Sequence, residues 1–206
     1  MPYRIVPAAE IDPSWQRVVE REGVTVYRRA VPGSPIDESL AVTTLKTTLV
    51  AATALILDVD NHHRWIDAVD ESRVLKRLSQ TESINYTVSY APWPVSDRDA
   101  VVRTRVAQDA ASLIVQIGSE ALPDYLPRKP GRVRVEAIAS GWQLRPLPDG
   151  GVEVRYRVHS SPGGQLPGWL VNAVVTEQPL NTLINMQQAV QQAIYRQAQP
   201  GSIRQP

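Results

Sequence analysis

The second half of the chain consists of strand-like segments followed by a single long helical pattern. In the segment 152–158 the even positions are apolar or aromatic and the odd positions are charged, so one face of this strand is dry and the other faces water. The segment 101–106 likewise puts Arg103 and Arg105 on its wet side. A curved antiparallel sheet with one dry face needs a second layer. The C-terminal helix is the only predicted element large enough to supply that layer.

The predicted strands alternate or are rich in β-branched residues, and turns separate them. They cover 24–31, 40–50, 73–78, 83–90, 100–106, 113–117, 133–144 and 152–159. Helices are predicted over 12–23, 51–59 and 61–66, and from Pro167 to Ile194. No linker or repeat divides the chain, so we expect one α+β domain over 1–206, with its core at about 12–197.

The C-terminal helical pattern changes character along its length. Its second half carries one apolar stripe, formed by Leu180, Leu183, Ile184, Val190 and Ile194. Its first half, 169–175, is apolar on nearly all sides and therefore needs cover from more than one direction. Pro179 lies inside the pattern, where it removes a backbone hydrogen bond and is expected to bend the helix.

Charge and composition exclude several classes of function. A net charge of +1 gives no long-range field to attract nucleic acid, and without cysteine there is neither a disulfide nor a thiolate metal site. No apolar run approaches the roughly 18 residues of a bilayer span. The first four residues do not resemble a secretory signal. We therefore expect a monomer without nucleic-acid partners, cytoplasmic unless a signal peptide has been removed, in which case it is periplasmic or secreted.

The chain lacks the common enzyme motifs, namely a phosphate-binding glycine loop, a His-Glu-x-x-His helix and a Gly-x-Ser-x-Gly turn. Asp58 and His62 share a helix face and could hold a metal, but a closed site needs more ligands. A solvated helix end is the favoured interpretation. His159 has no recognisable nucleophile as a partner. We expect no catalytic residue, no metal and no cofactor.

Outward-facing arginines form possible stripes across the predicted sheet, namely Arg103, Arg105, Arg132, Arg134, Arg155 and Arg157. Glu136 and Glu153 lie among them, which favours a solvated face with salt bridges. Contact of this face with anionic headgroups or with a protein partner remains an alternative.

The connection 90–99 places Trp93 between two prolines. An indole in such a loop either packs on the core as a plug, which is favoured, or anchors the loop at a membrane surface. Both interpretations suit a lid. Asp97, Arg98 and Asp99 are interpreted as a local ion-pair cluster that fixes the end of this loop.

Two stretches, Tyr90–Asp99 and Ser161–Asn172, resemble the StAR-related lipid-transfer (START) domain, and so do 23–28, Trp65 and 131–134. The resemblance implies a helix-grip fold, in which a curved antiparallel sheet wraps around a long C-terminal helix and encloses a hydrophobic cavity for one lipid. It also implies that Ala91–Asp97 and the first half of the last helix form a gate that makes transient contact with a membrane.

The same resemblance implies a set of residues that line the pocket or the gate. They are Tyr86, Val88, Tyr90, Trp93, Val102, Thr104, Val135, Ala137, Val154, Tyr156, Trp169, Leu170, Ala173, Val174 and Glu177. Some family members carry a buried arginine paired with an acid, and the matching positions here are Thr104 and Val88. The ion pair is thus expected to be absent, which suggests a less polar or differently shaped pocket.

The leading hypothesis is a carrier or sensor for one phospholipid or other acyl or sterol-like molecule. Burying about sixteen methylenes at about 0.8 kcal/mol each is worth roughly 12 kcal/mol, so exchange is expected at a membrane and not through water. The alternative is an enzyme of the polyketide cyclase type on the same helix-grip scaffold. It would need a polar dyad in the tunnel, for instance Tyr86 or Tyr156 with Glu177.

Overall fold

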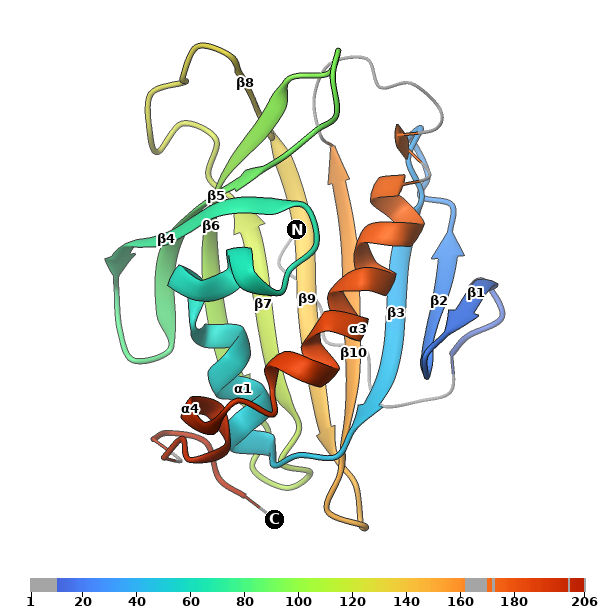
Figure 1. The fold of residues 1–206 in the computed structure, drawn as a ribbon, viewed down its shortest axis with the longest axis vertical. Coiled ribbons are helices and arrows are strands. Elements are labelled where there is room, and N and C mark those ends of the chain that lie inside the picture. Colours follow the sequence, from blue (N-terminus) through green and yellow to red (C-terminus); the bar gives the residue numbers. More distant parts are fainter. Residues whose placement is uncertain (1–10, 162–169, 172, 200, 206) are drawn as a thin grey trace.

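The computed structural model describes residues 11–161, 170–171, 173–199 and 201–205. These residues form one ten-stranded sheet and helices on one of its faces (Figure 1). The strands are β1 (Gln16–Arg21), β2 (Val24–Arg29), β3 (Glu38–Leu45), β4 (Val69–Arg77), β5 (Glu82–Ser89), β6 (Asp97–Gln108), β7 (Val115–Ala121), β8 (Arg132–Arg134), β9 (Ala137–Pro146) and β10 (Val152–Ser161). The helices are α1 (Leu49–Leu57), the 3₁₀-helix η1 (Val59–Arg64), the π-helix η2 (Ala173–Glu177), α3 (Gln178–Ala189) and α4 (Ala193–Arg196).

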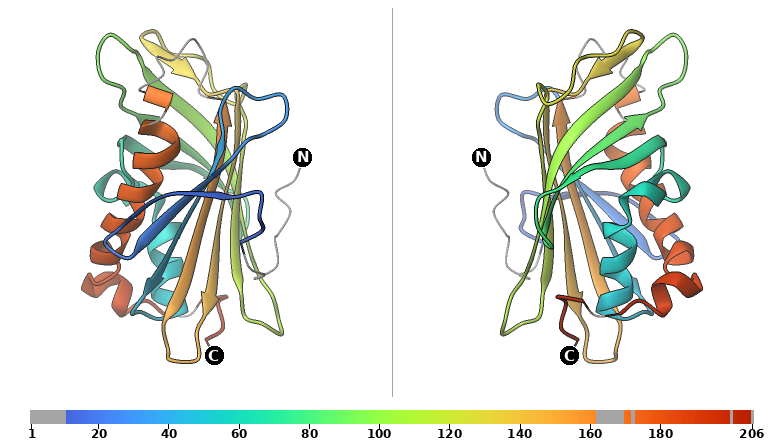
Figure 2. Two further views of the ribbon diagram at one scale, coloured as in Figure 1. Left: turned by 90° about the vertical axis from the view of Figure 1, so that its right-hand side faces the viewer. Right: turned by 90° about the vertical axis from the view of Figure 1, so that its left-hand side faces the viewer.

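The sheet is antiparallel and curved, in the order β1-β2-β3-β10-β9-β7-β6-β5-β4, and the short β8 pairs in parallel with β6. In the side views α1, α3 and α4 all lie on one side of the strands (Figure 2). The sheet does not close into a barrel, because β1 and β4 remain its two edges. The predicted α+β architecture of a curved sheet with a C-terminal helix across it is therefore confirmed. Among the described residues, no helix is both long and apolar enough to cross a bilayer.

Helix α3 packs its apolar stripe into the sheet. Leu180, Leu183 and Met186 are completely buried, in one cluster with Val154 and Leu144. Fully burying such side chains contributes roughly 1.5–3 kcal/mol each. The C-terminal helix is therefore held on the sheet by α3. The predicted second layer of the fold is confirmed.

The helix changes its hydrogen-bond pattern at the predicted proline break. Pro179 occupies the first turn of α3, directly after the π-helix η2. Because Pro179 has no N–H, it cannot bond to the carbonyl of Val175 four residues earlier. The buried hydroxyl of Ser39 in β3 donates a hydrogen bond to that carbonyl instead. The sheet thus supplies the partner that the proline removes.

The C-terminal end of the helix differs from the prediction. Val190 is buried as expected, but it is the C-cap of α3, and the chain turns there before α4 begins. Ile194 consequently leaves the stripe and is 66% exposed. The apolar spacing was right for the helix but did not show where the helix ends.

The segment 12–23 is a strand and not the predicted helix. Gln16–Arg21 pairs antiparallel with β2, and Arg21 lies opposite Val24. The two residues between them, Glu22 and Gly23, have φ of 51° and 73°. Two successive residues with positive φ are typical of the tight turn that joins two twisted strands. Gly23 therefore makes a hairpin turn and does not terminate a helix.

Two predicted strands also have different bounds. The segment 133–144 is divided into β8 and β9, because β8 continues the β6 ladder whereas β9 lies between β7 and β10. The segment 40–50 ends as a strand at Leu45. The hydroxyl of Thr48 then accepts a hydrogen bond from the amide of Ala51 at 3.1 Å and caps α1. This cap starts the helix two residues before the predicted position.

Candidate functional site

Strand β5 presents its polar side chains to the face of the sheet that α3 covers. Residues directly opposite each other on neighbouring strands share a face. Val106 of β6 packs on the main core beneath α3, so Val102, two pairs of residues further along the strand, lies on the same face. Asn85 is the partner of Val102 in β5. The side chains of Ser83, Asn85, Thr87 and Ser89 therefore lie on the α3 face.

The apolar side chains of β5 lie on the opposite face. Ile84, Tyr86 and Val88 form a separate buried cluster with Val101, against which Leu75, Leu122 and Leu126 pack. Tyr86 and Val88, which were expected to line the pocket, are thus covered by the segment 122–131. The apolar set of β5 therefore packs on the outer face of the sheet and not toward α3.

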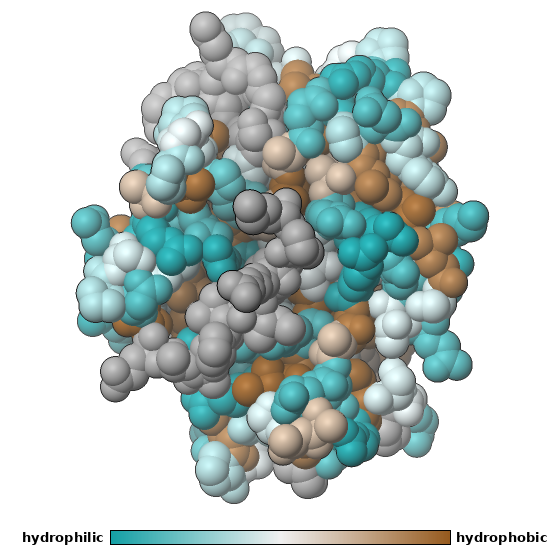
Figure 3. Space-filling view, turned by 180° about the vertical axis from the view of Figure 1, so that it is seen from behind, coloured by the Kyte–Doolittle hydropathy of each residue, from teal (hydrophilic) through white to brown (hydrophobic). Residues whose placement is uncertain are grey.

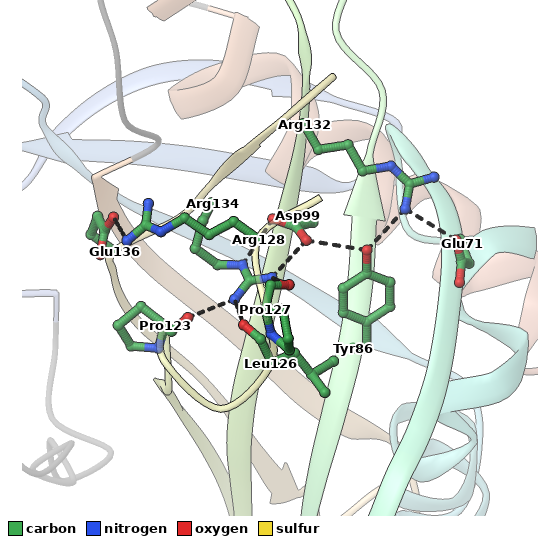
Figure 4. Close-up of polar contacts among 10 residues, drawn as sticks. All are labelled: Glu71, Tyr86, Asp99, Pro123, Leu126, Pro127, Arg128, Arg132, Arg134 and Glu136. Atoms are coloured by element: carbon green, nitrogen blue, oxygen red, sulfur yellow. Dashed lines mark hydrogen bonds and ion pairs between the residues drawn. The ribbon is translucent and has the colours of Figure 1, made fainter. Parts of the chain in front are cut away.

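A buried ion pair fixes the segment 122–131 to the sheet (Figure 4). Arg134 of β8 donates two hydrogen bonds to the carboxylate of Asp99, both at 2.9 Å, and each side chain is only 1% exposed. The guanidinium also donates to the carbonyl of Leu126 at 3.0 Å. Tyr86 donates its hydroxyl proton to Asp99 at 3.2 Å. The hydrogen bonds from Arg134 hold the pKa of Asp99 below its usual value.

The predicted local ion-pair cluster at 97–99 is wrong in its pairing. Asp97 accepts a hydrogen bond from the amide of Ala91 at 3.0 Å and so closes the 91–97 loop. Asp99 pairs with Arg134, 35 residues later in the chain, and not with its neighbour Arg98. The loop is thus closed locally by Asp97, whereas Asp99 anchors the start of β6 through a long-range partner that the local sequence does not show.

A row of small hydroxyl side chains crosses the α3 face of the sheet. The strand register places five hydroxyl residues in this row, one strand after another, and Val158 of β10 interrupts them. The row is Ser83, Thr104, Ser119, Ser140, Val158 and Ser39. Asn85 donates its amide N–H to Thr104 Oγ1 at 3.0 Å, and the hydroxyls of Thr104 and Ser119 are 2.9 Å apart. Asn85 is almost fully buried, yet its Oδ1 has no hydrogen-bond partner among the described residues.

The predicted loss of the family's ion pair leaves a neutral polar cluster in its place. The cross-strand neighbours of Thr104 are Ser83 and Ser119, and its hydrogen-bonded partner is Asn85, whereas Val88 lies on the other face. Around Thr104 the inner wall therefore keeps hydrogen-bonding capacity without a charge.

An aromatic stack lies directly beside the hydroxyl row on the same face. The rings of Trp142 and Tyr156 are stacked with centroids 4.0 Å apart, and Trp65 approaches Trp142 at 5.8 Å. All three are buried in the main core. Burial raises the pKa of Tyr156 to about 12, so its phenol stays neutral. The stack separates the fully packed lower core from the hydroxyl row.

On the side of the stack that carries the hydroxyl row, called the upper inner face below, the cover is incomplete. Ser39, Asn85 and Thr104 are buried there. Six short side chains are only half-buried, namely Val102, Ser119, Ala121, Ile138, Ser140 and Val158. Below the stack the corresponding positions, such as Leu144 and Val154, are completely buried. The upper inner face therefore combines short side chains, polar groups and incomplete cover, which are the features of a surface that can accept a ligand.

The structure divides the predicted pocket residues into several groups. Val102, Thr104, Val154 and Tyr156 lie on the α3 face, the last two within the packed core. Leu170 and Val135 are buried, and Ala173 and Val174 are half-buried. Ala137 is exposed. Trp169, Pro167 and the turn 162–164 lie outside the described residues.

The dyad required for catalysis is not assembled from Tyr86, because Tyr86 lies on the far face of the sheet. Glu177 is exposed and forms an ion pair with Arg21 of β1 at 3.4 Å. The histidines considered for chemistry are engaged elsewhere. His62 Nε2 is 2.8 Å from the carbonyl oxygen of Ile56, and His159 Nε2 is 3.0 Å from the hydroxyl of Ser34.

The side chain of Trp93 projects into solvent and is 90% exposed. The favoured interpretation of this indole as a plug packed on the core is therefore wrong. Tyr90, at the start of the same connection, is also exposed. Together they form an exposed aromatic tip, a name used below for Tyr90 and Trp93.

The outer face of the sheet carries the salt bridges predicted for it. Glu82 pairs with both Arg103 and Arg105, and Glu38 pairs with Arg157. Figure 3 views the molecule from behind, and there hydrophilic and hydrophobic side chains are intermingled. Arg134 is the exception to the predicted stripe, since it is buried in its pair with Asp99.

Sequence reasoning missed the polar wall formed by Asn85, Ser119 and Ser140. A signal was present, because polar residues occupy every second position from Ser83 to Ser89. Only the register with β6 shows that this polar side, and not the apolar one, faces the helix.

Comparisons with known proteins agree with this architecture. Residues 7–194 match the family model described as "START domain". The chain is 33% identical over 177 residues to an uncharacterized protein of Pseudomonas aeruginosa, covering 86% of this chain and 87% of that protein. It is 27% identical over 181 residues to the phosphatidylcholine transfer protein of Mus musculus, covering 86% and 84%. The crystal structure of a StAR-related lipid transfer protein fragment from Xanthomonas axonopodis superposes with a TM-score of 0.80 at 36% identity, covering 87% of this chain and 99% of that one. The chain belongs to the START domain family.

Proposed function

We propose that this protein binds one hydrophobic ligand, a phospholipid or another acyl or sterol-like lipid, between the upper inner face of the sheet and the C-terminal helix. Family membership and the similarity to a phosphatidylcholine transfer protein support this proposal. The observation that carries it is the division of the inner face at the stack of Trp142 and Tyr156. On one side of the stack the protein fills its own core, and on the other side the side chains are short and six of them are only half-buried.

The hydroxyl row provides the polar contacts that such a ligand needs. Ser and Thr hydroxyls can either donate or accept a hydrogen bond, so Thr104 and Ser119 can bind ester, amide or hydroxyl groups. The free amide oxygen of Asn85 adds an acceptor in the same place. A buried polar atom without a partner is costly, and a polar group of the ligand would satisfy it.

Exchange of the ligand is proposed to occur at a membrane surface, where the protein transfers or senses its lipid. A lipid tail of about sixteen methylenes gains roughly 12 kcal/mol from burial, which makes release into water slow. The exposed aromatic tip is suited to the membrane interface, where an indole can bury its ring and keep its N–H hydrated. The gate consists of the 91–97 loop and the helix before Pro179.

The experiment fills the upper inner face with a larger side chain. Ser119→Leu places a bulky group in the middle of the hydroxyl row and should reduce the uptake of fluorescent phosphatidylcholine from vesicles at least about tenfold. Ala107→Leu, at an exposed position of β6 on the outer face, is the matched control and should leave uptake unchanged. Mass spectrometry of the purified wild-type protein identifies the lipid that it carries. The proposal fails if the wild-type protein neither copurifies with a hydrophobic molecule nor extracts one from vesicles.

A further inference from the structure

Arg98 is a buried cation that forms no ion pair with any described residue. Its residue surface is only 9% exposed, and its Nε has no hydrogen-bond partner among the described residues. The guanidinium donates one hydrogen bond, from Nη1 to the carbonyl of Ser96 at 2.5 Å. Desolvation by burial lowers the pKa of Arg98 below its ordinary value, which indicates an environment unfavourable to the charge.

Neither neighbouring acid forms an ion pair with Arg98. Asp99 is bound by Arg134 on the opposite face of the sheet. Asp97 accepts the amide N–H of Ala91, and its charge offsets part of the effect of burial on the pKa of Arg98. Within the described part of the chain, Arg98 forms no ion pair. Leaving a charge buried without a counter-ion is strongly unfavourable, more so than a well-formed buried pair. Arg98 therefore keeps a buried donor, Nε, for which the described residues supply no acceptor.

Arg98 lies on the ligand side of the sheet, at the end close to the gate. It alternates along β6 with Ala100, Val102 and Thr104, which all lie on the α3 face. Its cross-strand partner is Ser89, a half-buried residue with a hydroxyl. Arg98 also directly follows the 91–97 loop that carries the exposed aromatic tip. The unpaired charge thus stands between the hydroxyl row and the membrane-facing loop.

We infer that Arg98 binds the phosphate group of a phospholipid ligand. This inference rests on the proposed function and narrows it to lipids whose anionic group lies at the gate end. The planar guanidinium can donate two parallel hydrogen bonds to a phosphate. Nε, which has no partner among the described residues, can be one of these two donors. The acyl chains would then extend from Arg98 toward the hydroxyl row and the aromatic stack.

The test compares two lipids that differ only in the headgroup. Vesicles contain either dioleoylphosphatidylcholine or dioleoylglycerol in an inert carrier lipid, and the amount of each that the full-length protein extracts is measured by mass spectrometry. We expect the wild-type protein to prefer the phosphate-bearing lipid at least about tenfold, the range of a charge-assisted hydrogen bond. Arg98→Gln should abolish this preference while the uptake of dioleoylglycerol persists. Arg98→Lys keeps the charge but loses the fork, and should retain part of the preference.

Arg103→Gln is the control, because it removes a charge from the same strand on the outer face, where Arg103 pairs with Glu82. Arg103→Gln should leave the preference for the phosphate-bearing lipid unchanged.

A merely structural role of Arg98 would make Arg98→Gln lower the uptake of both lipids equally, and that result would overturn the inference. Addition of inorganic phosphate distinguishes a free phosphate site, since half-inhibition of lipid uptake at micromolar phosphate would also overturn it. If the wild-type protein extracts neither lipid, the carrier function itself is refuted, whereas equal uptake of both lipids by the wild type refutes only the role of Arg98.

Discussion

Replacing Asp99 by asparagine tests whether the buried pair with Arg134 holds the outer cover of the sheet in place. The substitution conserves the shape of the side chain but leaves the guanidinium of Arg134, which is 1% exposed, without its counter-ion. Removing one partner of a buried ion pair costs about 3–5 kcal/mol. For a domain of about 200 residues each kcal/mol corresponds to roughly 2–4 °C in the melting temperature, so Asp99→Asn should melt roughly 6–20 °C below the wild type.

The assay is urea unfolding followed by tryptophan fluorescence, with thermal unfolding as a second measurement. Glu136→Gln is the matched control, because Glu136 pairs with Arg128 in the neighbouring segment but both side chains are about half exposed, at 49% and 59%. An exposed pair contributes less than about 1 kcal/mol. Equal losses for Asp99→Asn and Glu136→Gln would show that burial does not decide the strength of the pair, and the argument for a fixed outer cover would then be refuted.

Four further predictions follow from the same structure. Because Arg134 lowers the pKa of Asp99, the contribution of this carboxylate is complete above the ordinary value of 3.8 and disappears as the pH falls through the lower folded value; the difference in unfolding free energy between wild type and Asp99→Asn should therefore be constant near neutral pH and shrink in acid. Thr48→Ala should cost about 1 kcal/mol in urea unfolding, because it removes the cap of α1. Leu183→Ala should cost about 2–5 kcal/mol, whereas Ile194→Ala should change stability by less than about 0.5 kcal/mol, and similar losses at both positions would contradict the observed end of the helix. Trp93→Ala should slow lipid transfer between vesicles severalfold without changing the melting temperature, and unchanged transfer would argue against membrane docking through the exposed aromatic tip.

The sequence was informative wherever one face of an element is apolar and the other is wet. The alternation in 152–158 and the stripe through Leu180 and Leu183 correctly predicted strand β10, helix α3 and the burial of both in one core. The hairpin turn at Gly23 was misread because a glycine after an amphipathic segment ends helices and joins strands equally well. Local spacing did not distinguish the two, and the decisive interaction is the pairing of β1 with β2.

Periodicity could not assign the faces of β5, because its apolar set packs on the outer face and its polar set lies on the side of the helices. Alternation separates two sets of side chains but does not say which set faces which layer. The resemblance to START domains implied that Tyr86 and Val88 line the pocket, and it did not point to Asn85. The structure reverses this, since the segment 122–131 covers the apolar set. The pair of Asp99 with Arg134, which fixes that segment, joins residues far apart in the chain and had no local signature.

The stack of Trp65, Trp142 and Tyr156 has a consequence for the empty state of a lipid carrier. On the side of Leu144 and Val154 the core is filled by the protein's own side chains. This part of the core therefore needs no ligand in order to be packed. For the proposed lipid-binding function, this means that the packed half of the core keeps the chain folded without a ligand. Only the side of the stack with the hydroxyl row would then have to adapt when a lipid binds.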